Sequence, residues 1–295
     1  MLRATSWQCG PVLSLLFDFA YCWGNVGHRT VAYLAEAQLP PSARLQLSDL
    51  TGFDDVSDAA IWADTVTSEP SHKHTAPWHY INVDDSPPES CNVSTPVDWI
   101  RPNILTALIN QTNIATHRER SKAEQQEAYR YIIHLVGDLH QPLHVEGLAR
   151  GGVDIPVDFE GSPTNLHLVW DVNFITRLRR GMGADEKVIA KLWTKELLLK
   201  GDAKPTTAKC DSLNNARECF LRWARESNAK VCKHVLHEGL TNIENKELAG
   251  AYYETNVGVV EDAVYMAGSR LADWLLLVLE NQHTAEADVH IHVDL

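Results

Sequence analysis

Apolar residues recur at helical spacing along most of this chain. Between Val26 and Leu39, residues such as Val31, Leu34 and Ala35 stand three and four positions apart, and two prolines follow. This period is typical of an amphipathic helix that ends at proline. The same period predicts six further helices, at about Ser57–Val66, Pro96–Thr116, Lys122–His140, Asp185–Leu199, Ala216–Leu236 and Val257–Glu280.

One segment alternates in the way a strand does. Residues Val153 to Phe159 alternate apolar with acidic side chains, follow Gly151-Gly152 and end at Glu160-Gly161, which predicts a small β-hairpin. No internal repeat, low-complexity tract or break in composition divides the chain. We therefore expect a mainly α-helical fold, with one domain over residues 23–282 and a loose polar tail at 283–295.

The first 22 residues have the features of a secretory signal. Arg3 stands near the start, an apolar segment runs from Pro11 to Tyr21, and small side chains occupy Ala20 and Cys22. This order predicts cleavage before Trp23 and secretion of residues 23 onward. The alternative is a buried first helix.

Composition narrows the class of protein. The chain has 295 residues, 44% of them apolar and 22% charged, which is ordinary for a globular protein. No apolar run approaches the roughly 18 to 20 residues that span a bilayer. The net charge of −13 should repel polyanions, so a nucleic-acid partner would need concentrated positive charge, for which bound metal is the obvious source.

Cysteines and glycosylation patterns fit an oxidising compartment. After removal of the signal the chain keeps an even number of cysteines, namely Cys91, Cys210, Cys219 and Cys232, as secreted proteins commonly do. Asn92-Val-Ser and Asn110-Gln-Thr match the N-glycosylation pattern. Both asparagines are therefore candidate glycosylation sites.

Histidine and aspartate crowd one stretch, HLVGDLHQPLH at residues 134–144. His134 and Asp138 lie four apart and share a helix face, and His167 and Asp171 repeat that spacing. Either pair alone is equally well explained as a structural hydrogen bond. Two pairs with His144, among apolar neighbours, favour divalent cations, because buried charges need partners.

The expected new N-terminus adds a further ligand. A free α-amine has a pKa near 8, so Trp23 could bind a metal through its amine and close a chelate through its carbonyl oxygen. His28 follows five residues later. Cleavage and metal binding would then be coupled.

These motifs together resemble the secreted zinc-dependent nucleases of the S1/P1 type. The resemblance extends from Trp23 to about Trp274 and rests on WGNVGHRTVAYLAEAQL, IWADT, WHYINVDD, the stretch quoted above, NLHLVWD and SRLADWL. It implies a helical fold around three zinc ions. The implied ligands are Asp64, His79, His134 and Asp138 for one ion, Asp138, Trp23 and His28 for a second, and His144, His167 and Asp171 for the third.

The implied chemistry is phosphodiester hydrolysis. Zinc lowers the pKa of bound water to about 7, and two ions that share a carboxylate can hold it for attack on phosphorus. The third ion would neutralise a phosphate oxygen and the departing oxygen. In this interpretation Asp64 and Asp138 are catalytic residues as well as ligands.

The chain departs from the family around the substrate. Asn82 replaces a usual aspartate, Thr67 a usual basic residue and Val153 a frequent asparagine. Tyr80 stands where the family has an aromatic residue that stacks on a base, although core packing would also explain it. We expect Tyr80 and Asn82 to contact substrate.

Two consequences of these departures remain open. Either the protein is a nuclease with altered base preference or rate, in which His72, Lys73 or His74 supplies the missing positive charge, or its substrate is no longer nucleic acid. The first is favoured.

The resemblance also assigns the residues left over. His140 lies two positions beyond Asp138, is not a family ligand and should have a supporting or structural role. Cys91 and Cys232 align with a family disulfide. By count, Cys210 and Cys219 would form a second disulfide.

The favoured function is a secreted zinc endonuclease and 3′-nucleotidase. It would cleave single-stranded DNA and RNA to 5′-phosphorylated products, with 3′-nucleotides as further substrates and with no membrane or obligate protein partner. One alternative is a phospholipase C of the trinuclear-zinc type, in which the last ligand is typically glutamate, so Asp171 favours the nuclease. Another is a catalytically weakened homologue that only binds nucleotides or zinc.

Overall fold

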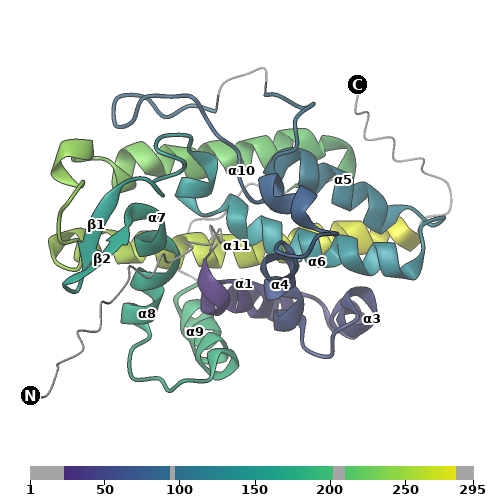
Figure 1. Cartoon of the computed structure of the whole chain (residues 1–295). Helices are drawn as coiled ribbons and strands as arrows, with labels where there is room; N and C mark the ends of the chain where they lie inside the picture. Colours follow the sequence, from purple (N-terminus) through teal and green to yellow (C-terminus); the bar gives the residue numbers. More distant parts are fainter. Residues whose placement is uncertain (1–22, 94–96, 202–209, 284–295) are drawn as a thin grey trace, which may run out of the picture.

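The fold is mainly α-helical, as the sequence predicts. The computed structural model describes residues 23–93, 97–201 and 210–283. The expected signal at 1–22, and the expected tail apart from His283, lie outside these residues. One two-stranded antiparallel sheet accompanies the helices (Figure 1).

The α-helices are α1 (Gly24–Gln38), α2 (Pro41–Arg44), α3 (Leu47–Thr51), α4 (Val56–Val66), α5 (Ile104–Thr116), α6 (Lys122–Leu139), α7 (Leu166–Leu168), α8 (Phe174–Leu178), α9 (Glu186–Lys200), α10 (Ala216–Lys230) and α11 (Ala251–His283). Short 3-10 helices are η1 (Lys73–His79), η2 (Pro142–Val145), η5 (Leu213–Asn215) and η7 (Leu240–Asn242). Two π-helical turns are η3 (Val169–Asn173) and η6 (Val231–Val235). The strands are β1 (Pro156–Phe159) and β2 (Ser162–Asn165).

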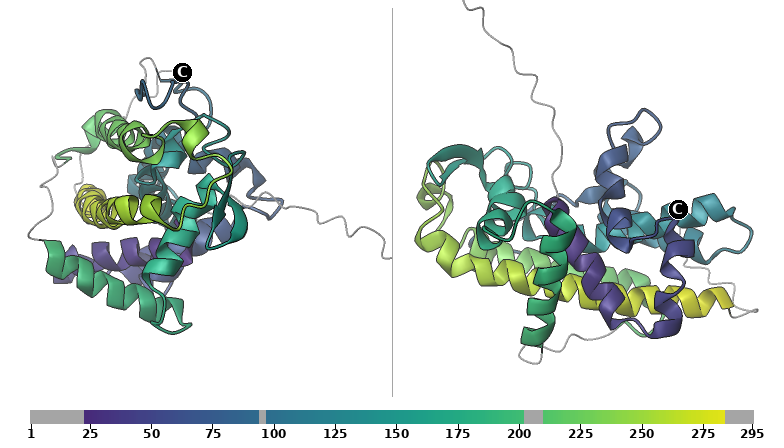
Figure 2. Two further views of the ribbon diagram at one scale, coloured as in Figure 1. Left: turned by 90° about the vertical axis from the view of Figure 1, so that its left-hand side faces the viewer. Right: turned by 90° about the horizontal axis from the view of Figure 1, so that it is seen from below.

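The long helix α11 runs along most of the molecule, with α10 on one side of it and α1 with α9 on the other (Figures 1 and 2). Helix α1 packs against α4, α9 and α11, while α6 packs against α4, α5 and α11. Helices α1 and α6 also touch. Helices α1, α4 and α6 therefore contact one another in the interior.

Local sequence signals determine where these helices begin. Ser121 and Glu124 form a capping box at the start of α6, and Asp55 caps α4. The helix predicted from Pro96 is shorter than expected and starts at Ile104. Asn103 caps it, because its side chain accepts from the backbone N–H groups of the following turn.

Other boundaries also differ from the prediction. Helix α11 is longer at both ends, and α10 changes to a π-helical turn after Lys230. The predicted strand begins at Pro156 instead of Val153, because residues 149–152 all have positive φ and form a left-handed turn. Glu160 and Gly161, both with positive φ, make the predicted hairpin turn.

Both predicted disulfides, Cys91–Cys232 and Cys210–Cys219, are present. Asn92 and Asn110, the latter on α5, are both exposed. Within the described ranges no helix is both long and apolar enough to cross a membrane.

Candidate metal centre

The first group of candidate metal ligands comes from helices α6, η1 and α4. His134 and Asp138 lie one turn apart at the end of α6, and His79 ends η1. The His134 Nε2 and His79 Nδ1 atoms lie 3.1 and 3.0 Å from Asp138 Oδ2, and 3.4 and 3.7 Å from Asp64 Oδ1 on α4. Two imidazole nitrogens and two carboxylates therefore converge on one point.

The second group adds α1. His28 Nε2 lies 3.2 Å from Asp138 Oδ1, so the two oxygens of Asp138 face different histidines. The His28 ring stacks on His134, with centroids 4.0 Å apart, and the Trp23 indole donates to the Gly137 carbonyl at 2.8 Å. Trp23 and His28 thus lie against the same turn of α6, and both are buried, as are His134 and Asp138.

The third group of candidate ligands comes from η2, α7 and η3. His167 Nε2 is 2.9 Å and His144 Nε2 3.8 Å from Asp171 Oδ2. His167 belongs to the three-residue helix α7, and Asp171 lies in the π-helical turn that follows. The predicted spacing of four still brings both side chains together, although π-helical turns, which are frequent at functional sites, were not predicted here.

Backbone carbonyls determine which nitrogen of three histidines faces the centre. The Nδ1 atoms of His134, His144 and His167 lie 2.7 Å from the carbonyl oxygens of Ala60, His79 and Gly151, respectively. A ring that donates through Nδ1–H leaves its Nε2 available, which is the usual arrangement of metal-binding histidines.

His79 has the opposite orientation. Its Nδ1 faces Asp138, while its Nε2 lies 3.4 Å from the hydroxyl of Thr67. The Thr67 hydroxyl donates to the Ala63 carbonyl, so it is free to accept the Nε2–H of His79. Thr67 therefore contacts the candidate ligand His79. The sequence analysis noted only that Thr67 replaces a usual basic residue and did not predict this contact.

The donor set fits divalent zinc. Among the described residues, the buried atoms without a hydrogen-bond partner include His28 Nε2, Asp138 Oδ1, His144 Nε2 and Asp171 Oδ2. Each such atom costs about 1–3 kcal/mol if left unsatisfied. A metal ion would satisfy them, and nitrogen with carboxylate oxygen is a donor set that zinc prefers.

Electrostatics keep the acidic ligands charged. Burial acts to raise the pKa of Asp138, but the neighbouring imidazoles, His134 first, hold it well below its ordinary value. Burial acts to lower the pKa of His144, but the nearby carboxylates of Asp171 and Asp138 raise it to about 9. For His28 burial prevails and lowers the pKa. The carboxylates are thus ready to bind a cation, whereas His144 must first lose a proton.

The centre reaches solvent at two ligands. The Asp64 side chain is 26% exposed and that of His167 is 11% exposed. Tyr80 and Asn82 are exposed just after His79, and the Ile81 N–H donates to the carbonyl of His144. The predicted substrate residues therefore lie on a segment that joins the first and third groups.

The residues that could supply the missing positive charge lie on η1 or directly before it. His72 approaches the carboxylates of Glu69 and Glu127 to 3.8 Å, so its positive charge would be offset. Lys73 and His74 are exposed. Val153 is partly buried just after the left-handed turn.

His140 faces away from all three groups. Its ring donates to the Val136 carbonyl and accepts from Arg270 of α11 at 3.0 Å. Burial and the Arg270 charge hold its pKa well below the ordinary value. This neutral, buried ring agrees with the supporting role expected for it.

Gln141 was not predicted as a functional residue. It is fully buried, and its amide donates to Asp171 Oδ1 at 2.6 Å. The available signal in the sequence was a polar residue within an apolar segment, between the candidate ligands Asp138 and His144.

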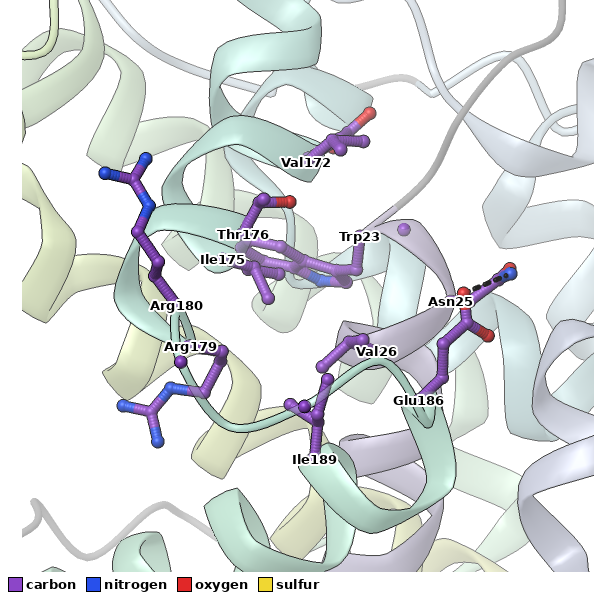
Figure 3. Close-up of a pocket in the computed structure, with 14 residues that line it drawn as sticks. Trp23, Asn25, Val26, Val172, Ile175, Thr176, Arg179, Arg180, Glu186 and Ile189 are labelled. Carbon is purple, nitrogen blue, oxygen red and sulfur yellow. Dashed lines mark hydrogen bonds between the residues drawn. The ribbon is translucent and has the colours of Figure 1, made fainter. Parts of the chain in front are cut away.

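A cavity of about 350 Å³ borders the centre. Trp23 and Asp171 line it together with residues of α8, α9 and their connection, and Asn25 bonds Glu186 across one edge (Figure 3). Open space therefore adjoins the backbone at which the mature chain would begin.

Comparison with known proteins gives consistent results. The family model for S1/P1 Nuclease matches residues 23–280. The chain is similar to Nuclease S1 of Aspergillus oryzae (strain ATCC 42149 / RIB 40), with 33% identity over 273 residues, covering 89% of this chain and 94% of that protein. It is similar to Nuclease P1 of Penicillium citrinum, with 32% identity over 263 residues, covering 86% and 96%. It also resembles Endonuclease 3 of Arabidopsis thaliana, with 26% identity over 287 residues, covering 90% and 91%.

Proposed function

Because this chain belongs to the S1/P1 nuclease family, and is thus a phosphodiesterase that acts on nucleic acid, we propose that it is a zinc-dependent endonuclease and 3′-nucleotidase. Its substrates would be single-stranded DNA and RNA and 3′-nucleotides, and its products would carry 5′-phosphates. The observation that carries this proposal is the convergence of His28, His134 and His79 on the two oxygens of Asp138.

Nine residues would hold three zinc ions. Asp138 would bridge two ions, because its oxygens face different histidines. The ligands would be Asp64, His79, His134 and Asp138 for one ion, Asp138, His28 and the amine and carbonyl of Trp23 for another, and His144, His167 and Asp171 for the third. When bound, zinc supplies Lewis-acid chemistry, which acidifies water and offsets the negative charge of a phosphate.

The protein's own groups would orient the reactants. Asp64 is the most exposed of the eight ligand side chains, so it is suited to orient water at the opening. The exposed ring of Tyr80 offers a surface on which an unstacked base can lie, and Asn82 would bond the edge of that base. Unstacked bases are available in single strands, so duplexes should be poor substrates.

Secretion would complete the site. Removal of residues 1–22 would free the Trp23 amine, and the extracellular space would preserve both disulfides. Asn92 and Asn110 would be glycosylated there. The start of α1 directly after Trp23 and the two disulfides support this proposal. The proposed function needs no membrane and no obligate protein partner.

The test is to purify the naturally processed protein and to measure its zinc content and its products. We expect three zinc ions per chain, an N-terminal tryptophan, and release of 5′-mononucleotides from single-stranded DNA and RNA. Parallel assays on 3′-AMP and phosphatidylcholine separate nucleotidase from phospholipase activity. Bound zinc without any release of nucleotides, from acid to neutral pH, would refute the nuclease.

A further inference from the structure

We propose that Gln141 is a positioning residue for the third ligand group, because its amide determines which oxygen of Asp171 remains for a metal ion. This inference rests on the proposed function, since it concerns the third zinc position. It adds a residue that is not itself a ligand.

The orientation of the Gln141 amide is fixed by its neighbours. The Leu143 N–H donates to Gln141 Oε1, because a backbone N–H can only donate. The NH₂ end therefore faces Asp171 Oδ1, at 2.6 Å. Gln141 is also the residue that caps η2, so its side chain has little freedom to turn.

The two oxygens of Asp171 consequently have different surroundings. Oδ1 accepts from Gln141, while Oδ2 has no hydrogen-bond partner and faces His167 at 2.9 Å and His144 at 3.8 Å. The amide holds the carboxylate at one angle and leaves a single oxygen toward the histidines. Asp171 is thereby prepared to bind through Oδ2 alone.

Burial makes this contact hard to replace. Gln141 and Asp171 are both fully buried, so without the amide, water would not readily reach Oδ1. The carboxylate could then rotate and present both oxygens to the histidines. Loss of such an outer contact typically weakens metal binding 10- to 100-fold.

The position of Gln141 in the chain links the groups. It lies between Asp138, whose oxygens serve the first two groups, and His144 of the third. A change in its contact with Asp171 should therefore affect the third zinc ion first and the other two less.

Two substitutions test this role. Gln141→Met keeps the length of the side chain but removes the donor. Gln141→Glu keeps an acceptor for Leu143 while it replaces the donor with a carboxylate, so it serves if the first variant does not fold. We expect both to bind one zinc ion 10- to 100-fold more weakly than the wild type, with the other two retained.

Ser227→Ala is the matched control. The Ser227 hydroxyl donates to the Leu139 carbonyl of the same segment, and Leu139 is not a candidate ligand. This variant should lose stability but keep all three zinc ions. Urea unfolding in EDTA measures the fold without metal, and zinc competition with a chelator measures affinity apart from activity.

If all three variants bind zinc more weakly than the wild type, or if all three bind it with wild-type affinity, the proposal is wrong. Wild-type zinc affinity in Gln141→Met or Gln141→Glu overturns it, as does an equal loss of zinc in Ser227→Ala. The spectrum of the Co²⁺-substituted protein should also change in the Gln141 variants only, because it reports ligand geometry. Failure of the wild type to bind a third ion would instead refute the proposed function.

Discussion

Gly137→Ala should separate zinc binding from folding. A Cβ atom at Gly137 would lie 2.9 Å from His28 Nδ1 and 3.0 Å from His28 Cε1. Favourable contacts between such atoms begin near 3.5 Å, so the ring would have to move by roughly 0.6 Å. His28 is fully buried and stacked on His134, which leaves it little room to do so.

The two effects of this substitution have different sizes. In a helix interior, alanine is favoured over glycine by about 1 kcal/mol, while overpacking a core costs about 1–3 kcal/mol. The free energy of unfolding without metal should thus fall by at most about 2 kcal/mol. Metal–ligand distances tolerate only about 0.2 Å, so zinc held through His28 should bind 10- to 100-fold more weakly.

The assay compares three proteins. Zinc content and nuclease rate are measured for the wild type, Gly137→Ala and Gly258→Ala, and urea unfolding is measured in EDTA. Gly258 lies within α11 and a Cβ there would meet nothing within 4 Å, so its variant should keep its zinc and gain up to about 1 kcal/mol of stability. If Gly137→Ala keeps full zinc content and rate, the close approach of His28 to α6 is not what positions this ligand.

Three further outcomes follow from the same geometry. Asp138→Ala should abolish hydrolysis because it removes the shared carboxylate, whereas His140→Ala should keep most activity per folded molecule; equal losses in kcat/KM would contradict the ligand assignment. One extra residue before Trp23 converts the amine to an amide, so elemental analysis should find less zinc and the rate should fall about 100-fold; an unchanged rate would exclude the amine as a ligand. Burial and the nearby Asp85 carboxylate raise the pKa of Glu146 to about 7, so its stabilising effect is full below about pH 4.5 and lost as the pH rises through 7. Between pH 5 and pH 8 the free energy of unfolding of the wild type should therefore fall by on the order of 2 kcal/mol more than that of Glu146→Gln, both measured by urea unfolding in EDTA. An identical fall in the two proteins would show that Glu146 does not titrate in this range.

The sequence predicted the elements that have a long period or a clear cap. Helix α6 was predicted almost to its ends because Ser121 begins it and Pro142 follows it closely. Helices α7 and α8 were missed, since three and five residues are too few to display a period. The start of α5 was misplaced because apolar residues before Asn103 continue the period into a loop.

The ligands were predictable to different degrees, for physical reasons. His134 and Asp138 share one helix face, so their spacing alone brings them together. Asp64 and His79 come from separate elements, and no local spacing relates them to α6. Their assignment required the resemblance, and the distances to Asp138 and His134 now give it a geometric basis.

The contacts that orient the candidate ligands from behind were the hardest to predict. The carbonyls of Ala60 and Gly151 orient His134 and His167, yet every residue has a carbonyl, so no residue type signals this role. The Gly151 carbonyl is available because residues 149–152 turn through positive φ. The paired glycines indicated a turn, but not which atom the turn presents.

The crowding of residues 134–144 follows from where this segment runs. Its side chains face different partners in turn, because helix α6 ends at Leu139 and η2 changes the direction of the chain. His134 and Asp138 face the first two groups, His140 bonds Arg270, and Gln141 contacts the third group through Asp171. One short segment thus joins all three groups to α11. The dense set of polar residues in this otherwise apolar interior is thus explained by the different partners that they contact.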